Sequence, residues 1–272
     1  MDAGRVRTRA STTQGRAVED EVTVPGISER DRAEVERSAA EAASTVLRPI
    51  EVDRYVNPSG DTSYPLEFAH YLLGDVRGKT VLDLGCGSGE NLIPLIKRGA
   101  NVIAIDISPE LVDLSRRRVE SYGLTATYAV RSAYETGLPD SSVDVVFSMS
   151  LLHHLDLPRA SAEIRRILRP GGMFILKEPI RFSASMNRLR RLFPAPEVDI
   201  SDYEHPMTRE EIAVVSSGFN ILAKRSFRLP MIPLFQKLKL RPKQLWSLDS
   251  WILRTFPGME HFATSRVMCL QK

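Results

Sequence analysis

Cysteine is nearly absent from this sequence: Cys86 and Cys269 are the only two in 272 residues. Two cysteines cannot build the disulfide framework of a secreted scaffold, so a reducing, cytoplasmic location is the default prediction. Long apolar runs are absent too, since no segment approaches the roughly eighteen apolar residues of a membrane-spanning helix. Residues 1–29 lack the apolar stretch of a secretion signal and are predicted to form a disordered tail, with an arginine-containing organelle transit peptide as the alternative.

Charge of neither sign dominates the chain, because 37 Lys and Arg balance 34 Asp and Glu for a formal net charge of +3. With 43% apolar residues, the composition is that of a globular protein with a buried core. The length predicts one domain of about 220 residues with extensions. The positive charge is local, since residues 181–272 hold 15 Lys or Arg against 8 Asp or Glu.

Three glycines at alternate positions form the most informative motif. Gly85, Gly87 and Gly89 follow an apolar run and precede a helical pattern that opens at Glu90. Without a Cβ, the backbone of such a strand-to-helix turn can lie against a ligand, with a helix N-terminus behind it. An ordinary tight turn is the alternative, so the rest of the chain has to decide between the two.

The residues around these glycines indicate which ligand would fit. The dinucleotide fingerprint G-x-G-x-x-G needs its third glycine at position 90, which is Glu90 here. The pyrophosphate of a dinucleotide would also lie beside the like charge of Asp83. S-adenosylmethionine carries positive charge on its ammonium and sulfonium groups, and a carboxylate at this strand end would favour it.

A second strand and helix follow at the expected distance. The apolar segment 101–106 ends in Asp106, whose carboxylate can accept hydrogen bonds from both hydroxyls of a ribose. Ser108 and Pro109 are typical of a helix N-cap and first helical position, and Gly123 is typical of the end of that helix. The pattern predicts a βαβα unit.

Further elements follow in order. The pattern predicts a third strand over 126–132, a fourth over 143–149, a helix over 158–168, a turn over 169–172 and a fifth strand over 173–178. Farther on, Thr208 and Glu211 predict a capping box at the start of a helix. Two further strands are expected over 219–227 and 262–270.

This series resembles the class I S-adenosylmethionine-dependent methyltransferases, in particular the small-molecule, methyltransferase type 11-like subgroup. The resemblance is close over residues 79–178 and covers the C-terminal part only in outline. It implies an α/β, Rossmann-like fold: a mostly parallel seven-stranded sheet with an antiparallel last strand and helices on both faces. It implies S-adenosylmethionine as the cofactor, released as S-adenosylhomocysteine.

The resemblance also implies a set of cofactor-binding residues along the carboxyl ends of the strands. They are Asp83, Gly85, Cys86, Gly87, Gly89, Asp106, Ile107, Ser132, Ala133, Tyr134 and Met149. Ser132 departs from the family, which commonly has an acidic residue there to bind the adenine amino group. A serine hydroxyl can accept that hydrogen bond but supplies no charge. The backbone of Ala133 and packing from Tyr134 and the Leu152 region are the alternative means of holding adenine.

Four residues are candidates for catalysis. His153 and His154 follow the fourth strand, and a histidine can remove a proton from an acceptor hydroxyl near neutral pH, although in the subgroup this pair is often positional. His205 lies in a polar and aromatic loop, where a solvated histidine is the alternative. Glu178 ends the fifth strand and is expected to point into the ligand crevice, with a salt bridge to a neighbouring arginine as its alternative. No metal is predicted, because Met149 and Ser150 stand where metal-assisted relatives carry acidic residues.

The chain is thus predicted to have three parts: the tail 1–29, a helical cap segment 30–78 and a methyltransferase domain 79–272 with an insertion at about 228–258. The insertion interleaves lysines with large apolar residues. A cap whose lysines face water is favoured over contact with a membrane surface or an amphiphilic substrate. Nothing in the sequence predicts the oligomeric state.

The predicted function is metal-independent methyl transfer to a small or amphiphilic organic acceptor, at oxygen, nitrogen or carbon, in the setting of secondary metabolism. One alternative is an RNA or DNA methyltransferase, favoured by the basic C-terminal part. It is disfavoured because Met149–Leu152 replaces the Asn/Asp-Pro-Pro-aromatic tetrad of amino-methylating nucleic-acid enzymes. The other alternative is a scaffold that binds the cofactor without catalysis.

Overall fold

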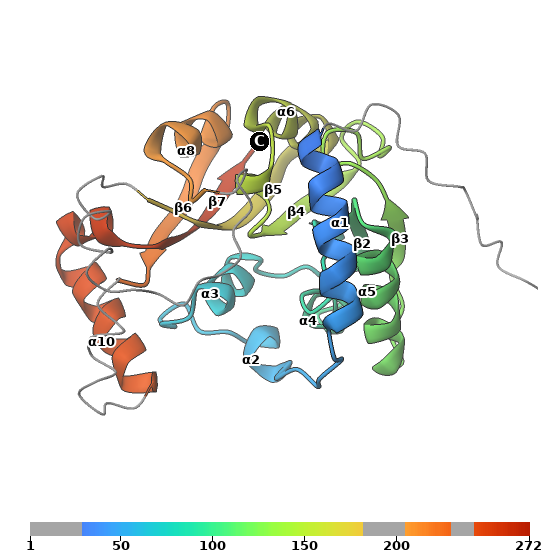
Figure 1. Ribbon diagram of the computed structural model, residues 1–272. Coiled ribbons are helices and arrows are strands. Elements are labelled where there is room, and N and C mark those ends of the chain that lie inside the picture. Colours follow the sequence, from blue (N-terminus) through green and yellow to red (C-terminus); the bar gives the residue numbers. More distant parts are fainter. Residues whose placement is uncertain (1–28, 182–204, 230–241) are drawn as a thin grey trace, which may run out of the picture.

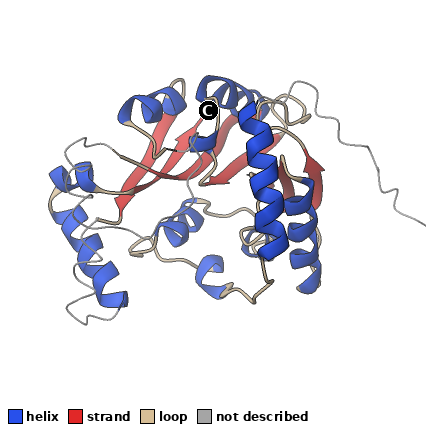
Figure 2. Ribbon diagram, in the orientation of Figure 1, coloured by secondary structure: helices blue, strands red, loops and turns tan. Residues whose placement is uncertain are grey.

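Seven strands form one sheet in the order β3-β2-β1-β4-β5-β7-β6 in the computed structural model, which describes residues 29–181, 205–229 and 242–272 (Figures 1 and 2). Strands β1 to β5 pair in parallel, and β7 pairs antiparallel with both β5 and β6. This is the predicted Rossmann-like sheet with its antiparallel last strand, which is therefore confirmed. The strands are β1 Thr80–Leu84, β2 Asn101–Asp106, β3 Thr127–Val130, β4 Val143–Met149, β5 Leu168–Pro179, β6 Asn220–Phe227 and β7 Ser265–Gln271.

Helices cover both faces of the sheet. Helices α3, α4 and α5 pack on one face, whereas α6 and α8 pack on the other (Figure 1). Helix α1 lies outside the first layer against α5, and α10 lies beside β6. The helices are α1 Glu29–Ser44, α2 Asp53–Val56, α3 Pro65–Leu72, α4 Leu92–Lys97, α5 Pro109–Ser121, α6 Leu157–Ile167, α8 Arg209–Ser216 and α10 Pro242–Thr255, with short 3-10 helices η1 Leu152–His154 and η2 Pro257–Phe262.

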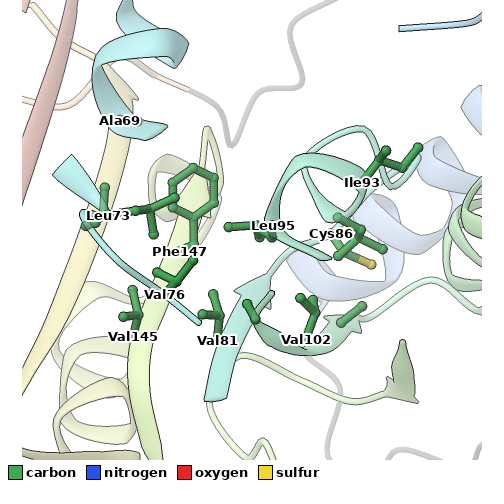
Figure 3. Packing of buried hydrophobic residues seen from close by; sticks show 14 of the residues in the cluster. Ala69, Leu73, Val76, Val81, Cys86, Ile93, Leu95, Val102, Val145 and Phe147 are labelled. Atoms are coloured by element: carbon green, nitrogen blue, oxygen red, sulfur yellow. The ribbon is translucent and has the colours of Figure 1, made fainter. Parts of the chain in front are cut away.

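The alternation of side chains along the central strands builds a core on each face. In β1, Val81 packs under α3 and α4, and Leu82 packs under α6 and α8. Figure 3 shows the first of these cores, where Leu73, Val81 and Phe147 are among the fully buried residues. Burial of each such side chain stabilises the fold by about 1.5–3 kcal/mol. The carboxyl ends of the parallel strands are thereby held in register at one edge of the sheet.

Local signals in the sequence set two helix starts as predicted. The Ser108 hydroxyl accepts from the backbone N–H of Leu111 at 3.2 Å, and Pro109 is the first residue of α5. Thr208 and Glu211 form the predicted capping box of α8, with side-chain to backbone distances of 3.2 and 2.8 Å. Each cap satisfies backbone N–H groups that the first turn of a helix cannot pair.

Some boundaries differ from the prediction. The first helix after the glycine turn begins at Leu92 and not at Glu90, and β3 ends at Val130, so Ser132 lies beyond the strand in a bridge with Glu135. Strand β5 begins at Leu168 and passes through the predicted turn 169–172, where Gly171 has a positive φ of 75° and the pairing with β4 shifts register. A glycine accommodates that irregularity without steric cost.

The predicted tail 1–29 falls almost wholly outside the described residues, as does 230–241 of the predicted insertion. The described part of the insertion consists of residues 228–229, helix α10 and the first residues of η2. Within the described ranges, every helix is too short or too polar to cross a membrane. Trp251 of α10 is 57% exposed. Contact of this insertion with a membrane surface stays a prediction.

Candidate active site

A pocket of about 250 Å³ lies at the carboxyl ends of β1, β2 and β4. The order of the sheet reverses between β1 and β4. From β1 the chain continues outward to β2 and β3 on one side, whereas β4 and β5 lie on the other side of β1. Loops that leave the two strands in opposite directions open a crevice at such a point, and ligands of open α/β sheets bind there. The pocket is therefore located where the topology alone would place a ligand.

The glycine turn forms the base of this pocket. Gly85 and Gly87 line it, with positive φ angles of 74° and 50° that favour glycine. A Cβ at Gly85 would lie 2.9 Å from the side chain of Leu151, whereas a Cβ at Gly87 would meet no atom within 4 Å. The turn thus leaves its backbone open to a ligand at Gly87 and packs against the opposite wall at Gly85.

Gly89 has a different role in the same turn. It does not line the pocket, and a Cβ there would lie 2.7 Å from the Cβ and 2.8 Å from the Cα of Ser115 in α5. Cys86 also lies behind the turn, with its thiol 3.8 Å from the Ser115 hydroxyl and its pKa raised by burial. Both predicted cofactor residues therefore support the turn from behind.

Two carboxylates stand at the strand ends beside the turn. Asp106 lines the pocket, and its carboxylate accepts from the backbone N–H of Gly87 at 2.9 Å and of Ser108 at 3.0 Å. Burial raises the pKa of Asp106 in spite of these hydrogen bonds. Asp83 does not line the pocket; it is fully buried, and neither of its carboxylate oxygens has a hydrogen-bond partner among the described residues. Burial, with the charge of Asp106, raises the pKa of Asp83 well above its usual range.

The far end of the pocket is formed after β2 and β3. Ile107, Ser132 and Ala133 line it, together with Leu151 and Leu155. The hydroxyl of Ser132 accepts from the backbone N–H of Tyr134 at 3.2 Å. Tyr134 itself does not line the pocket; its hydroxyl accepts from the backbone N–H of Asp156 at 2.8 Å. Leu152, predicted to pack near adenine, is buried in the core.

Helix α1 closes the pocket from the opposite side. Its residues Arg30, Glu34 and Arg37 are among those that line the wall facing the glycine turn. Glu34 lies 3.4 Å from His154, and Arg30 donates to the carbonyl oxygen of His153 at 2.9 Å. Burial opposes ionisation of Glu34, but hydrogen bonds with His154 and Arg37 outweigh it and lower its pKa to about 2. These contacts fasten α1 to η1, across the pocket mouth.

His153 and Glu178 form a buried pair behind the pocket wall. Nδ1 of His153 lies 2.8 Å from Oε2 of Glu178, and Oε1 of Glu178 accepts from the backbone N–H groups of Leu151 and Leu152 at 3.0 and 2.9 Å. Glu178 is fully buried and lies outside the pocket lining, so its carboxylate does not point into the crevice as predicted. It holds η1, and with it Leu151, in place.

The four predicted catalytic residues are only partly brought together. His153 and His154 belong to η1 and Glu178 is bonded to it, and of the three only His154 lines the pocket. His205 lies elsewhere, with its ring nitrogen 2.8 Å from Oε1 of Glu211 at the start of α8 and a side chain that is 54% exposed. The pocket lining does not include it. A catalytic function of any of the four stays a prediction.

Sequence reasoning missed several residues that hold the site. Arg118 is 2% exposed and donates from Nε to the Ser88 carbonyl oxygen at 2.6 Å, which ties the glycine turn to α5. Its signal was available, because Arg118 falls on the apolar face of α5 with Leu111 and Leu114. Lys177, an isolated cation in the apolar strand β5, bonds to Ser150 in the pocket wall and was assigned no function.

In the described ranges, the structure has no group of three or more His, Cys, Asp or Glu side chains that could hold a metal ion. The prediction of a metal-independent site therefore stays a prediction. The pocket itself carries charges of both signs, since Asp31, Glu34 and Asp106 line it together with Arg30 and Arg131.

Comparison with known proteins adds independent findings. Residues 82–176, from β1 to β5, match a family described as a methyltransferase domain. An uncharacterized methyltransferase of Mycobacterium tuberculosis (strain ATCC 25618 / H37Rv) is 40% identical over 114 residues, 42% of this chain and 44% of that protein. A ubiquinone biosynthesis O-methyltransferase of Cereibacter sphaeroides is 32% identical over 116 residues, 42% of this chain and 44% of that protein. The matches thus span less than half of the length of these relatives.

A solved structure extends the likeness of the fold beyond the matched segment. The geranyl diphosphate C-methyltransferase of Streptomyces coelicolor A3(2), crystallised with Mg²⁺, geranyl diphosphate and S-adenosyl-L-homocysteine, superposes with a TM-score of 0.59. The superposition covers 90% of this chain and 98% of that chain at 13% sequence identity. At this identity the likeness shows the fold alone.

Proposed function

We propose, from the premise that residues 82–176 form a domain of the class I S-adenosylmethionine-dependent methyltransferase family, that this protein transfers a methyl group to a small organic acceptor. The observation that carries the proposal is the pocket at the carboxyl ends of β1, β2 and β4. There the open backbone of Gly87 and the carboxylate of Asp106 face one cavity.

The residues of the pocket fit S-adenosylmethionine by their chemistry. Asp106 would hold the ribose hydroxyls, since its carboxylate faces the pocket and has acceptor positions beyond the two N–H groups that it already binds. Ile107, Ser132 and Ala133 would hold the adenine. Asp83 has no positive partner among the described residues, and a cationic ligand above the glycine turn would offset its buried carboxylate.

S-adenosylmethionine, when bound, supplies an electrophilic methyl group on a sulfonium. The task of the protein is then to align the acceptor with that group and to exclude water. Helix α1 performs the second task, because the contacts of Arg30 and Glu34 with η1 close the wall opposite the glycine turn. Met149 and Ser150 line the pocket where β4 ends, and an acceptor has to approach there.

His154 is the proposed proton acceptor for a hydroxyl acceptor, because it lines the pocket whereas His153 lies behind the wall. Nδ1 of His153 is bonded to Glu178. The same carboxylate binds the N–H groups of Leu151 and Leu152, so that the ring and the pocket wall are positioned by one buried group. For a neutral amine acceptor, alignment alone is the proposed contribution, and the methylated product loses its extra proton to water; a carbon acceptor, like a hydroxyl, must give its proton to a base.

The experiment is a methyl-transfer assay with methyl-labelled S-adenosylmethionine and a panel of small hydroxyl, amine and carbon acceptors, with RNA and duplex DNA added. We expect the wild type to release S-adenosylhomocysteine with a small acceptor and Asp106→Ala to lose this activity. The matched control is Asp113→Ala, because Asp113 is 64% exposed on α5, away from the pocket lining, and pairs with Arg117 at 2.9 Å.

Three outcomes separate the alternatives. Transfer of the labelled methyl group to RNA or DNA would identify a nucleic acid, in place of a small molecule, as the acceptor. Binding of S-adenosylmethionine without transfer to any acceptor would favour the scaffold. Equal activity in Asp106→Ala and Asp113→Ala would contradict the assigned cofactor site. Secondary metabolism as the setting stays part of the proposal, and the identity of the acceptor found in the assay tests it.

A further inference from the structure

Lys177 is a partly buried cation whose hydrogen-bond partner, Ser150, lines the pocket. Its ammonium donates to the Ser150 hydroxyl at 2.6 Å, and the backbone N–H of Ser150 donates to the Lys177 carbonyl oxygen at 2.7 Å. Ser150 lines the pocket and has a positive φ of 61°, an uncommon conformation for a residue with a side chain. The Ser150 hydroxyl thus joins Lys177 to the pocket wall.

No carboxylate of the described ranges forms an ion pair with Lys177. Its neighbour Glu178 points to the other face of β5, as successive residues of a strand do, and both Glu178 oxygens already accept hydrogen bonds. Burial lowers the pKa of Lys177; the charge of Glu178 opposes this shift, and the positive charge of Arg228 adds to it. A buried ammonium without a counterion is costly, so an anion at this position would be bound favourably.

Arg228 supplies the second positive group. It follows β6 with a positive φ of 63°, and its guanidinium lies 4.8 Å from the centre of the Trp246 ring. Asp249 is the nearby acid, but its two oxygens accept from the backbone N–H groups of Arg228 and Leu229 at 2.9 and 2.6 Å. Arg228 is therefore a second cation, close enough for its charge to act on Lys177.

We propose that Lys177, Ser150 and Arg228 form a subsite that binds an anionic oxygen group of the methyl acceptor, a carboxylate or a phosphate. This inference rests on the proposed function, because the anion belongs to the acceptor and orients it toward the methyl group. The ammonium of Lys177 and the hydroxyl of Ser150 donate to the anion, and the charge of Arg228 adds attraction. Lys177 is thereby a specificity-determining residue.

The experiment is calorimetric titration of the protein loaded with S-adenosylhomocysteine, with acetate, inorganic phosphate and pyrophosphate as probes. Three proteins are compared: wild type, Lys177→Met and Lys224→Met. Lys224 is the matched control because it is an exposed lysine on the neighbouring strand β6 and lies outside the pocket lining. Arg228→Gln is the second variant if Lys177→Met does not fold.

We expect at least one probe to bind the wild type and the Lys224→Met control with equal affinity, and about tenfold more weakly to Lys177→Met. Acetate and phosphate distinguish a carboxylate from a phosphate subsite. Equal affinities in the wild type and Lys177→Met, or no binding of any probe, would overturn the subsite.

The titration with S-adenosylhomocysteine itself separates this inference from the proposed function. All three proteins are expected to bind it equally, since Lys177 does not line the pocket. If the wild type does not bind S-adenosylhomocysteine, the proposed function fails, and the anion titration on the free protein still tests the subsite. A higher midpoint of thermal unfolding in Lys177→Met would further indicate that a buried, unpaired ammonium is kept for binding.

Discussion

Alanine substitutions in the glycine turn should separate ligand binding from packing. A Cβ at Gly87 would meet no protein atom within 4 Å, and Gly87 lines the pocket. A Cβ at Gly89 would lie 2.8 Å from the Cα of Ser115, an atom of the α5 backbone. We therefore expect Gly87→Ala to fold and to lose affinity for S-adenosylhomocysteine, whereas Gly89→Ala should lose stability.

The magnitudes follow from two terms. Gly87 and Gly89 have positive φ angles of 50° and 81°, and such a conformation costs an alanine about 1–2 kcal/mol. Gly87→Ala should lower the free energy of unfolding by this amount only. Gly74 is the matched control, because it has a φ of 58°, no atom within 4 Å of an added Cβ and no part in the pocket. At Gly89 the overlap with α5 adds about 1–3 kcal/mol, for a total of about 2–5 kcal/mol.

The assay is urea unfolding of the three variants together with calorimetric titration of each with S-adenosylhomocysteine. Gly87→Ala and Gly74→Ala should unfold with similar free energies, and only Gly87→Ala should bind the ligand more weakly than wild type. Equal binding by these two variants would refute the contact of the turn with the cofactor. A Gly89→Ala variant as stable as Gly74→Ala would refute the close approach of the turn to α5.

Two further predictions concern buried titratable groups. Burial lowers the pKa of His70 from 6.5 to about 3. Below pH 6.5 the His70 side chain therefore binds a proton in the unfolded chain but stays neutral in the folded protein. Because of this difference, the free energy of unfolding should fall by about 4–5 kcal/mol between pH 6.5 and 3. His70→Phe should flatten this dependence in denaturation curves, and an unchanged slope would contradict the assignment. Glu178→Ala leaves the three hydrogen-bonding groups that Glu178 binds without a partner, so it should lower the free energy of unfolding by about 3–5 kcal/mol. Glu178→Gln should lower it less. Equal losses for the two variants in chemical denaturation would argue against this function of Glu178.

Much of the fold could be predicted because its signals are local. The caps at Ser108 and Thr208 depend on residues three positions apart, and the apolar run 143–149 needs only its own composition to indicate a buried strand. The glycine turn and Asp106 follow from the same kind of short-range pattern. The family resemblance then supplied the seven-stranded, mostly parallel sheet with its antiparallel last strand.

The rest of the site depends on contacts between distant segments. Arg30 reaches the His153 carbonyl oxygen across 123 positions, and no periodicity in either segment indicates that contact. Glu178 was expected in the crevice because it ends a strand, but a one-residue difference of register decides which face its carboxylate takes. Lys177, its neighbour, takes the face beside Ser150. Sequence patterns set the elements, and packing of the loops sets which side chains meet.

The most direct test of the central claim is calorimetric titration of the wild type and Asp106→Ala with S-adenosylhomocysteine. The account predicts binding at one site per chain in the wild type, with a dissociation constant on the order of micromolar, and a large loss of affinity in Asp106→Ala. No binding by the wild type, or equal binding by both proteins, would contradict the assignment of this pocket to the cofactor.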